Sequence, residues 1–179
     1  MLGDSISAAY GMDINEGWVA LLQGKLASEN YSYEVINASI SGEVSASGAQ
    51  RINALLAEHK PEWIIIELGA NDGLRGLPLT HLRKNLTEMI RKSQQVDAKV
   101  MLAGMQIFPN YGPRYTTAFK NLYAELAEQY ETALIPFILE GVGGNPKYIQ
   151  EDGLHPTADA QTVLLQNVWA VLEPLLSKE

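Results

Sequence analysis

The chain alternates between short apolar runs and segments with helical periodicity, and this alternation most constrains its fold. The runs 62–69 (EWIIIELG) and 99–107 (KVMLAGMQI) are almost continuously apolar. Such runs are typical of parallel strands that are buried on both faces. The run 33–39 (YEVINAS) predicts another strand, and 133–139 (ALIPFIL) predicts a weaker one because it contains Pro136.

Between these runs, apolar residues recur every three or four positions. The stripes predict amphipathic helices within 17–30, 52–56, 82–90, 119–130 and 163–175. Strands that alternate with helices are joined by right-handed crossovers, which give a parallel sheet with helices on both faces. We therefore predict an α/β fold in which residues 1–179 form a single domain.

The composition limits the classes of protein and partner. With 46% apolar and 19% charged residues among 179, the chain can bury a core without disulfides. The absence of cysteine excludes thiolate catalysis and cysteine-ligated zinc. A net charge of −8 disfavours nucleic acid as a partner. No apolar run reaches the roughly 18–20 residues of a membrane span, and no signal peptide is visible in the opening MLGDS.

Ligands of such sheets bind outside the carboxyl ends of the strands, so the residues that follow each strand are the candidates for function. Polar or glycine-containing loops follow the expected strands: SISGE at 39–43, GANDG at 69–73 and FPNYGPRY at 108–115. The opening GDSISAAYG is typical of another such loop, but only Met1 and Leu2 precede it. We therefore expect a first strand that is present only in part.

Ser5 and the segment 150–161 (QEDGLHPTADAQ) contain the groups that nucleophilic catalysis needs. A serine hydroxyl requires an adjacent base, and that base requires a group to orient it. Asp152 and His155 lie three residues apart on a predicted turn, and Pro156 indicates that His155 stands at a helix entrance. Taken singly, Ser5 is more typical of a helix N-cap, and the acid–histidine pair is equally typical of an Asp-Gly turn with a surface histidine.

Gly42 and Asn71 each come just after an expected strand. Acyl transfer needs donors aimed at the oxyanion of the tetrahedral intermediate, and a backbone N–H or an asparagine amide is suitable. Without a Cβ, Gly42 would let its N–H approach a substrate. Considered separately, a turn glycine and an Asx-turn asparagine are the commoner interpretations.

Four blocks in order resemble the signature of the SGNH (GDSL-type) hydrolases: GDSIS at 3–7, Gly42 within NASISGE, GAND at 69–72 and DGLHP at 152–156. The resemblance covers essentially the whole chain. It is closest to the bacterial thioesterase I, lysophospholipase and arylesterase group, through NDGLRGL, PNYGPRY and DGLHPTADAQ. It implies a flavodoxin-like three-layer α/β/α sandwich around a five-stranded parallel sheet, whose first strand is truncated here.

The resemblance also implies roles for these residues. Ser5 would be the nucleophile, His155 the general base and then acid, and Asp152 the residue that orients it. The oxyanion hole would consist of the N–H groups of Ser5 and Gly42 and the side-chain amide of Asn71. The expected enzyme is a serine esterase that hydrolyses carboxylic esters, and acyl thioesters or lysophospholipids, through an acyl-enzyme, without a cofactor. The implied location is the periplasm or the medium, with the cytoplasm left open.

Two loops on the same edge, 73–79 and 107–115, mix apolar residues with glycine. We expect them to wall an acyl pocket, with ordinary loop packing as the alternative; the candidate substrate-binding residues are Leu74, Leu77, Phe108 and Tyr111. His59 and His81 have no acidic neighbour at ligand spacing, so no metal site is expected. We further expect a monomer that acts on small acyl esters.

Two other classes of function remain open. The same doubly wound fold binds flavin mononucleotide, and the hydroxyl-rich GDSIS could hold a phosphate. A catalytically silent lipid- or glycan-binding module on a hydrolase scaffold is the other alternative. The missing glycine-rich fingerprint and the Asp152–His155 pair favour the hydrolase.

Overall fold

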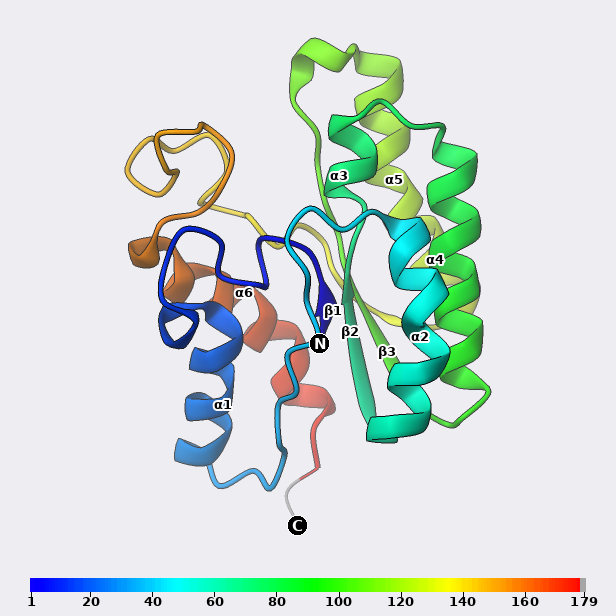
Figure 1. The fold of residues 1–179 in the computed structure, drawn as a ribbon, viewed down its shortest axis with the longest axis vertical. Coiled ribbons are helices and arrows are strands. Elements are labelled where there is room, and N and C mark those ends of the chain that lie inside the picture. Colours follow the sequence, from blue (N-terminus) through cyan, green and yellow to red (C-terminus); the bar gives the residue numbers. More distant parts are fainter. Residues whose placement is uncertain (178–179) are drawn as a thin grey trace.

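The computed structural model describes residues 1–177, so the last two residues of the predicted domain lie outside the described part. Its strands and helices alternate along the chain (Figure 1). They are β1 (Leu2–Gly3), α1 (Trp18–Ser28), α2 (Ser45–His59), β2 (Trp63–Glu67), α3 (Ala70–Leu74), α4 (Leu79–Gln94), β3 (Lys99–Ala103), α5 (Pro113–Tyr130), β4 (Ala133–Ile135) and α6 (Gln161–Leu172). Short 3₁₀ helices occur at Ile14–Glu16, Pro109–Tyr111, Ala158–Ala160 and Glu173–Leu175.

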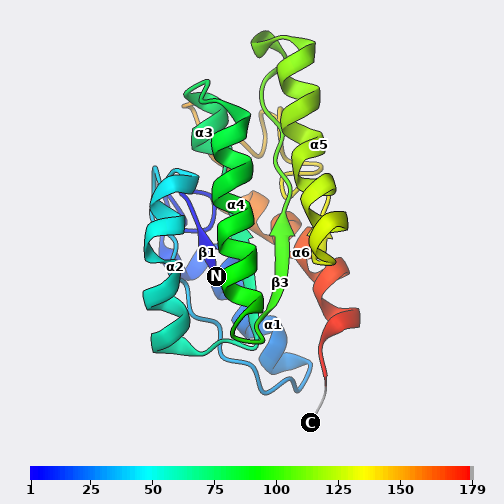
Figure 2. The same cartoon turned by 90° about the vertical axis from the view of Figure 1, so that its right-hand side faces the viewer.

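The strands form a parallel sheet in the order β1-β2-β3-β4. One register runs across it, because Leu2 pairs with Ile66 and Ile66 pairs with Leu102. Helices α1 and α6 cover one face of the sheet, and α2, α4 and α5 cover the other (Figures 1 and 2). The predicted three-layer α/β fold is therefore confirmed, although the sheet has four strands and not the expected five.

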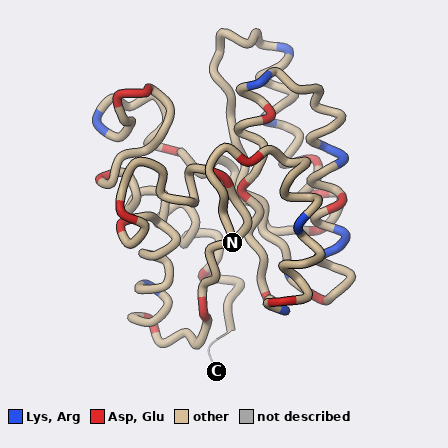
Figure 3. Tube along the Cα trace, viewed as in Figure 1, with Lys and Arg blue, Asp and Glu red and all other residues tan. Residues whose placement is uncertain are grey.

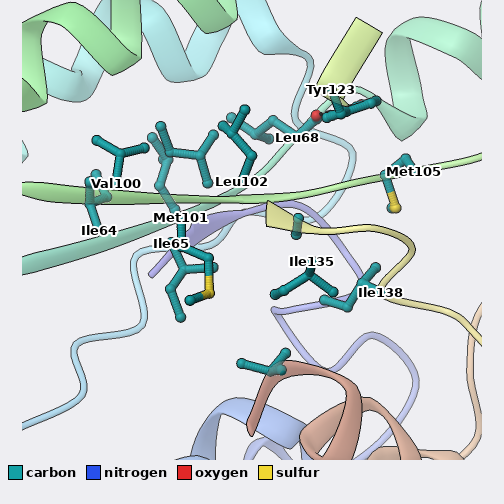
Figure 4. Packing of buried hydrophobic residues seen from close by; sticks show 14 of the residues in the cluster. Ile64, Ile65, Leu68, Val100, Met101, Leu102, Met105, Tyr123, Ile135 and Ile138 are labelled. Carbon is teal, nitrogen blue, oxygen red and sulfur yellow. Dashed lines mark hydrogen bonds between the residues drawn. The ribbon is translucent and has the colours of Figure 1, made fainter. Parts of the chain in front are cut away.

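The core lies on both faces of β2 and β3, which explains why these strands read as continuous apolar runs. Ile64, Ile65 and Ile66 are all buried. In Figure 4, Val100 and Met101 point to opposite sides of β3, as successive residues of a strand must. The helices bury the predicted stripes against these faces; on α4 the buried residues include Leu82, Leu86, Met89 and Ile90.

The prediction of a strand at 33–39 is wrong. This segment is extended and runs beside β1, since Ala38 N–H donates to Met1 C=O at 2.9 Å and the Met1 amino group donates to Ile36 C=O at 2.7 Å. Nearer its first residue, the segment is bonded to α1 and not to β1. The side chain of Gln23 accepts from Val35 N–H at 2.7 Å. The segment makes these hydrogen bonds without being part of a strand.

A groove lies at the amino-terminal end of the sheet. It lies between segment 33–38 and the first half of β2, and its volume is about 290 Å³. We call it the strand groove; its lining is largely apolar and includes Met1, Leu22, Leu26, Val35, Leu55, Trp63 and Ile65. In the described pairing, β1 meets β2 only at Ile66 and Glu67, so the earlier residues of β2 pair with β3 alone.

Candidate active site

Three loops meet at the carboxyl edge of the sheet, although they are far apart in the sequence. Ser5 follows β1, Asn71 lies at the start of α3 directly after β2, and His155 lies in the loop before α6 (Figure 1). All three residues line one cavity. The parallel sheet has thus brought together the residues that the loops were expected to contribute.

Ser5 lies in a series of turns and not at a helix N-cap, since α1 begins only at Trp18. Its side chain is nearly enclosed, with 9% of the residue exposed. The Ser5 Oγ lies 2.9 Å from His155 Nε2. This is hydrogen-bond distance between a hydroxyl and a general base, across 150 positions of the chain.

Asp152 holds His155 on both its backbone and its ring. Its Oδ2 lies 2.6 Å from His155 Nδ1, and its Oδ1 accepts from the N–H groups of Leu154 and His155 at 2.9 and 3.0 Å. These bonds, the one from the His155 backbone first, lower the pKa of Asp152 from 3.8 to about 2. The carboxylate is therefore ionised at neutral pH, and it orients the imidazole with Nε2 toward Ser5.

The expectation that His155 stands at a helix entrance is wrong by a few residues. Pro156 forms a bridge with Ile149, and the next helical residue is Ala158 in a 3₁₀ helix. Gly153, with φ +72°, provides the left-handed turn that lets Asp152 fold back on His155. A short hairpin, closed by Gln150 N–H donating to His155 C=O at 2.8 Å, fixes the loop.

Asn71 and Gly42, the other predicted oxyanion donors, differ in their relation to the cavity that Ser5 lines. Asn71 Nδ2 donates to Asp4 Oδ2 and to Glu43 C=O, each at 3.0 Å, and Asn71 lines the cavity. Gly42 has φ +78° in the turn that precedes α2, and it is not among the lining residues of that cavity. Its carbonyl accepts from Arg75 at 3.2 Å. The structure therefore places Asn71 in the wall of the cavity that Ser5 also lines, and it holds Gly42 in a turn outside that wall.

Beneath Ser5 lies a pair of buried carboxyl groups that sequence reasoning did not identify as a pair. Glu67 Oε2 accepts from Ser7 Oγ at 2.8 Å and from Asp4 N–H at 3.2 Å. Burial raises the pKa of Asp4 from 3.8 to about 6, and burial followed by the nearby Asp4 raises the pKa of Glu67 well above 4.5. Asp4 also accepts from Ile6 N–H at 3.1 Å, so the pair braces the turn that carries Ser5.

Asp72 braces the neighbouring loop. Its carboxylate accepts from Ser45 N–H at 2.8 Å and from Ser45 Oγ at 2.5 Å, which ties α3 to the start of α2. Asp4 and Asp72 thus act through hydrogen bonds to the loops around the site.

The cavity beside Ser5, which we call the acyl cavity, has a volume of about 310 Å³. Most of its wall is apolar, and it includes Ile6, Leu74, Met105, Ile107, Phe108, Phe137, Leu139, Ile149 and Leu154. A mainly apolar pocket with a few converging polar groups is typical of a small-molecule site. A hydrocarbon chain can therefore lie within reach of the Ser5 hydroxyl.

Two of the four predicted wall residues line this cavity and two do not. Leu74 and Phe108 are in its wall. Tyr111 lies behind it, where its hydroxyl donates to Leu74 C=O at 2.7 Å, and Leu77 C=O accepts from Tyr115 at 3.1 Å. The segments 137–144 and 149–154 were not predicted as walls, because no local pattern indicates that they fold over Ser5.

The remaining histidines lie away from this site, His59 at the end of α2 and His81 in the first turn of α4. Within residues 1–177, no group of three or more histidine, aspartate or glutamate side chains is arranged to hold a metal ion. In the same range, no helix is both long and apolar enough to cross a membrane.

Known proteins resemble this chain over nearly its whole length. It is 56% identical over 176 residues to the esterase TesA of Pseudomonas aeruginosa, covering 98% of this chain and 88% of that protein. It is 38% identical over 179 residues to the thioesterase 1/protease 1/lysophospholipase L1 of Escherichia coli, covering 100% and 85%. The crystal structure of the psychrotrophic esterase EstA from Pseudoalteromonas sp., inhibited by monoethylphosphonate, superimposes with a TM-score of 0.93 at 41% identity, covering 97% and 95%.

Residues 1–163 match the GDSL-like lipase/acylhydrolase family. This match and the named esterases favour the hydrolase over the flavin-binding and catalytically silent alternatives. The chain therefore belongs to the GDSL-like lipase/acylhydrolase family and is a carboxylic ester hydrolase.

Proposed function

We propose that Ser5, His155 and Asp152 form the catalytic triad of this esterase. The observation that carries the proposal is the continuous chain of contacts from Asp152 Oδ2 to His155 Nδ1 at 2.6 Å and from His155 Nε2 to Ser5 Oγ at 2.9 Å. The order nucleophile, base and orienting acid is the arrangement that activates a serine hydroxyl.

In the first half of the reaction, His155 Nε2 accepts the Ser5 hydroxyl proton while Oγ attacks the acyl carbonyl carbon. The tetrahedral intermediate collapses when the bond to the leaving alcohol or thiol breaks, and His155 returns the proton to that group. In the second half, His155 accepts a proton from a water molecule as the water oxygen attacks the acyl carbon of the acyl-enzyme. The bond from that carbon to Ser5 Oγ then breaks, and His155 returns the proton to Oγ. Asp152 keeps the same imidazole nitrogen directed at Ser5 throughout.

We also propose that the oxyanion is held by the N–H groups of Ser5 and Gly42 and by the Asn71 amide. The position of Asn71 in the wall of the acyl cavity supports this role. In this structure its two amide hydrogens point to Asp4 and Glu43. A substrate oxygen would replace one of these acceptors, so the Asn71 amide would become an oxyanion donor only when the substrate binds. Removal of one such donor typically slows acyl transfer about 10²–10³-fold.

The substrates proposed are neutral acyl esters, acyl thioesters and lysophospholipids with the acyl chain in the acyl cavity. Leu74 and Phe108 would contact the chain directly, while Leu77 and Tyr111 would support the wall. Figure 3 shows Lys and Arg interleaved with Asp and Glu over the helices, which is a poor match for a polyanion such as nucleic acid. Relatives named as an esterase and as a thioesterase and lysophospholipase support the same range of substrates.

The test is hydrolysis of p-nitrophenyl esters from acetyl to palmitoyl by the parent protein and by Ser5→Ala. We expect kcat to fall by about 10⁴–10⁶ in the variant while its melting temperature stays unchanged, because removal of the nucleophile ends acyl-enzyme formation. The parent's chain-length profile would measure the acyl cavity. A folded Ser5→Ala variant with full activity would contradict the proposed triad.

We further propose that the enzyme acts as a monomer in the periplasm or outside the cell. The location rests on the resemblance to exported hydrolases. The monomer is supported by the scatter of exposed apolar side chains over unrelated elements, among them Ile14, Ile40, Val96 and Leu175. Light scattering after gel filtration measures the oligomeric state, and fractionation of cells that express the native gene measures the location.

A further inference from the structure

Tyr10 lies over the ring of His155, and the triad does not explain why. The two ring centroids are 4.3 Å apart, and the ring planes are inclined by 35°. Nearly half of Tyr10 is exposed, at 49%, so the residue is not in place to fill the core. A large aromatic side chain is thus held at the surface with its inner face against the candidate base.

The backbone of Tyr10 is bonded to both halves of the site. Its N–H donates to the carbonyl of Ser5 at 3.1 Å, and its own carbonyl accepts from Gln150 Nε2 at 2.8 Å. Gln150 belongs to the hairpin that carries His155, and the same Nε2 donates to Pro156 C=O at 2.8 Å. In Figure 1 the dark blue N-terminal loop accordingly lies next to the orange loop before α6.

The turn that carries Tyr10 is shaped for this placement. Ala9 has φ +56° and Gly11 has φ +78°, so left-handed residues flank Tyr10 on both sides. A left-handed alanine is strained, and such strain persists only where the surroundings impose it. At Gly11, a Cβ would collide with the side chain of Gln150, so glycine allows the close approach of the two loops.

We propose that Tyr10 is a positioning residue for His155. The ring of Tyr10 keeps His155 Nε2 directed at Ser5 and stabilises the imidazolium that forms on His155 during acyl transfer. In that step the Ser5 O–H bond breaks, an N–H bond forms at His155 Nε2, and the imidazole becomes positively charged. The face of an aromatic ring attracts a cation that lies within about 6 Å of its centroid, and Tyr10 meets this condition. The inference rests on the role of His155 in the proposed function.

The experiment compares Tyr10→Leu and Tyr10→Phe with the parent enzyme on p-nitrophenyl butyrate. We expect Tyr10→Leu to lower kcat about 5- to 20-fold with KM within twofold, because the lost contact is strongest when the imidazole is charged. Tyr10→Phe keeps the ring face and should recover most of the lost kcat. The rate of inactivation by a p-nitrophenyl phosphonate, which reports attack by Ser5 alone, should fall by the same factor as kcat in Tyr10→Leu.

Two controls distinguish a positioning role for Tyr10 from a general effect of losing a tyrosine and from contact with the substrate. Tyr130→Leu, at the end of α5, makes the same chemical change away from the site and should leave kcat unchanged. If Tyr10 only contacted substrate, KM would rise and inactivation by a small phosphonate would not slow. A Tyr10→Leu enzyme that matches the parent in kcat, while His155→Ala is inactive, would overturn the inference and leave the triad in place.

An active His155→Ala enzyme would instead contradict the proposed function. Should Tyr10→Leu fail to fold, Gln150→Leu provides the second test, because it keeps the ring and removes the side-chain hydrogen bonds to Tyr10 and Pro156. A fall in kcat at constant KM in that variant supports the positioning role, and a parental kcat overturns it.

Discussion

The two ends of the parallel sheet differ in how their polar groups are satisfied. At the carboxyl edge, carboxylates are bonded to backbone N–H groups and side chains in continuous chains, from Asp72 through Ser45 and from Asp152 through His155 to Ser5. At the amino end, the strand groove leaves the first residues of β2 without a neighbour on the β1 side. Both ends border cavities of similar size, about 310 and 290 Å³.

This difference indicates that the two ends of the sheet have different roles. The carboxyl edge holds groups that chemistry needs, including the carboxyl groups of Asp4 and Glu67, whose pKa values are raised mainly by burial. The amino end holds a largely apolar groove, and the charged groups that border it, such as Glu62 and Lys60, lie outside the candidate active site, so we expect it to affect stability and not the reaction. Changes at one end should therefore leave the property of the other end unaltered.

The largest expected effect comes from Asp152→Asn at the carboxyl edge. Its Oδ1 can still accept from Leu154 and His155, so the turn persists. Its NH₂ would replace the Oδ2 that faces His155 Nδ1 and would favour the tautomer with the proton on Nε2. That nitrogen could then not accept the Ser5 proton, and we expect kcat/KM to fall about 10⁴-fold.

Steady-state kinetics with p-nitrophenyl butyrate and a thermal melt measure the two properties together. The matched control is Asp159→Asn, an exposed aspartate in the next 3₁₀ helix, which should keep full activity. If Asp152→Asn retained its activity at an unchanged melting temperature, the orienting role of Asp152 would be lost.

The fold was predictable from sequence where a segment carries its own evidence. The runs at 62–69 and 99–107 are apolar on both faces because β2 and β3 lie in the middle of the sheet, and they were assigned correctly. The segment 33–39 mixes apolar and polar residues, and whether it becomes a strand depends on how it pairs with its neighbour β1. Pairing between segments is a property of the assembled sheet, so it could not be predicted from the sequence of residues 33–39 alone.

The candidate site divides in the same way. Ser5, Asp152 and His155 were candidates from the chemistry that a serine nucleophile needs, their roles were implied by the resemblance to the SGNH hydrolases, and the structure brings them together. Glu67 was missed because its partners Ser7 and Asp4 lie 60 or more positions away. One signal was available, since a glutamate at the end of an apolar run is rarely buried without a specific partner. The contact of Tyr10 with His155 had no signal, because no catalytic chemistry requires a tyrosine at that position.

The next largest effect is an opposite pH dependence of stability at the two ends. The folded pKa of Asp4, about 6, lies above its usual 3.8, so its contribution is full below pH 3.8 and is lost as pH rises through 6. Burial, and then Arg51, lowers the pKa of the Met1 amino group from 8.0 to about 6. That contribution has the opposite sign, since it is full above pH 8 and is lost as pH falls through 6. The sum of these two contributions should be lowest near pH 6, and the raised pKa of Glu67 adds to the loss of stability as pH rises.

Urea unfolding at pH 4, 6 and 8 measures this dependence. Asp4→Asn should reduce the fall between pH 4 and 6, by on the order of 2 kcal/mol, and leave the contribution of the Met1 amino group between pH 6 and 8. Asp159→Asn should change neither contribution. A parent protein whose stability rises steadily from pH 4 to 8 would show that burial does not raise the pKa of Asp4.

The smallest expected effect, and the one that tests the amino end directly, is the filling of the strand groove. We expect four apolar, β-branched residues added ahead of Met1 to continue β1 in the register that pairs Leu2 with Ile66, so that the residue two positions before Leu2 would face Ile64. Burial of these side chains, offset by the entropy of ordering them, should raise the free energy of unfolding by about 1–3 kcal/mol. It should also remove the contribution of the Met1 amino group between pH 6 and 8, because that group becomes an amide.

An extension of four glycine and serine residues is the matched control for this change. It also removes the charged amino group, but it offers no apolar side chain to the groove, so it should raise stability less than the apolar extension. Because the groove lies at the opposite end of the sheet from Ser5, both extensions should leave kcat within twofold of the parent. If the two extensions gave the same free energy of unfolding, the added apolar side chains would not be buried in the strand groove. The proposed contrast between the two ends of the sheet would then be contradicted.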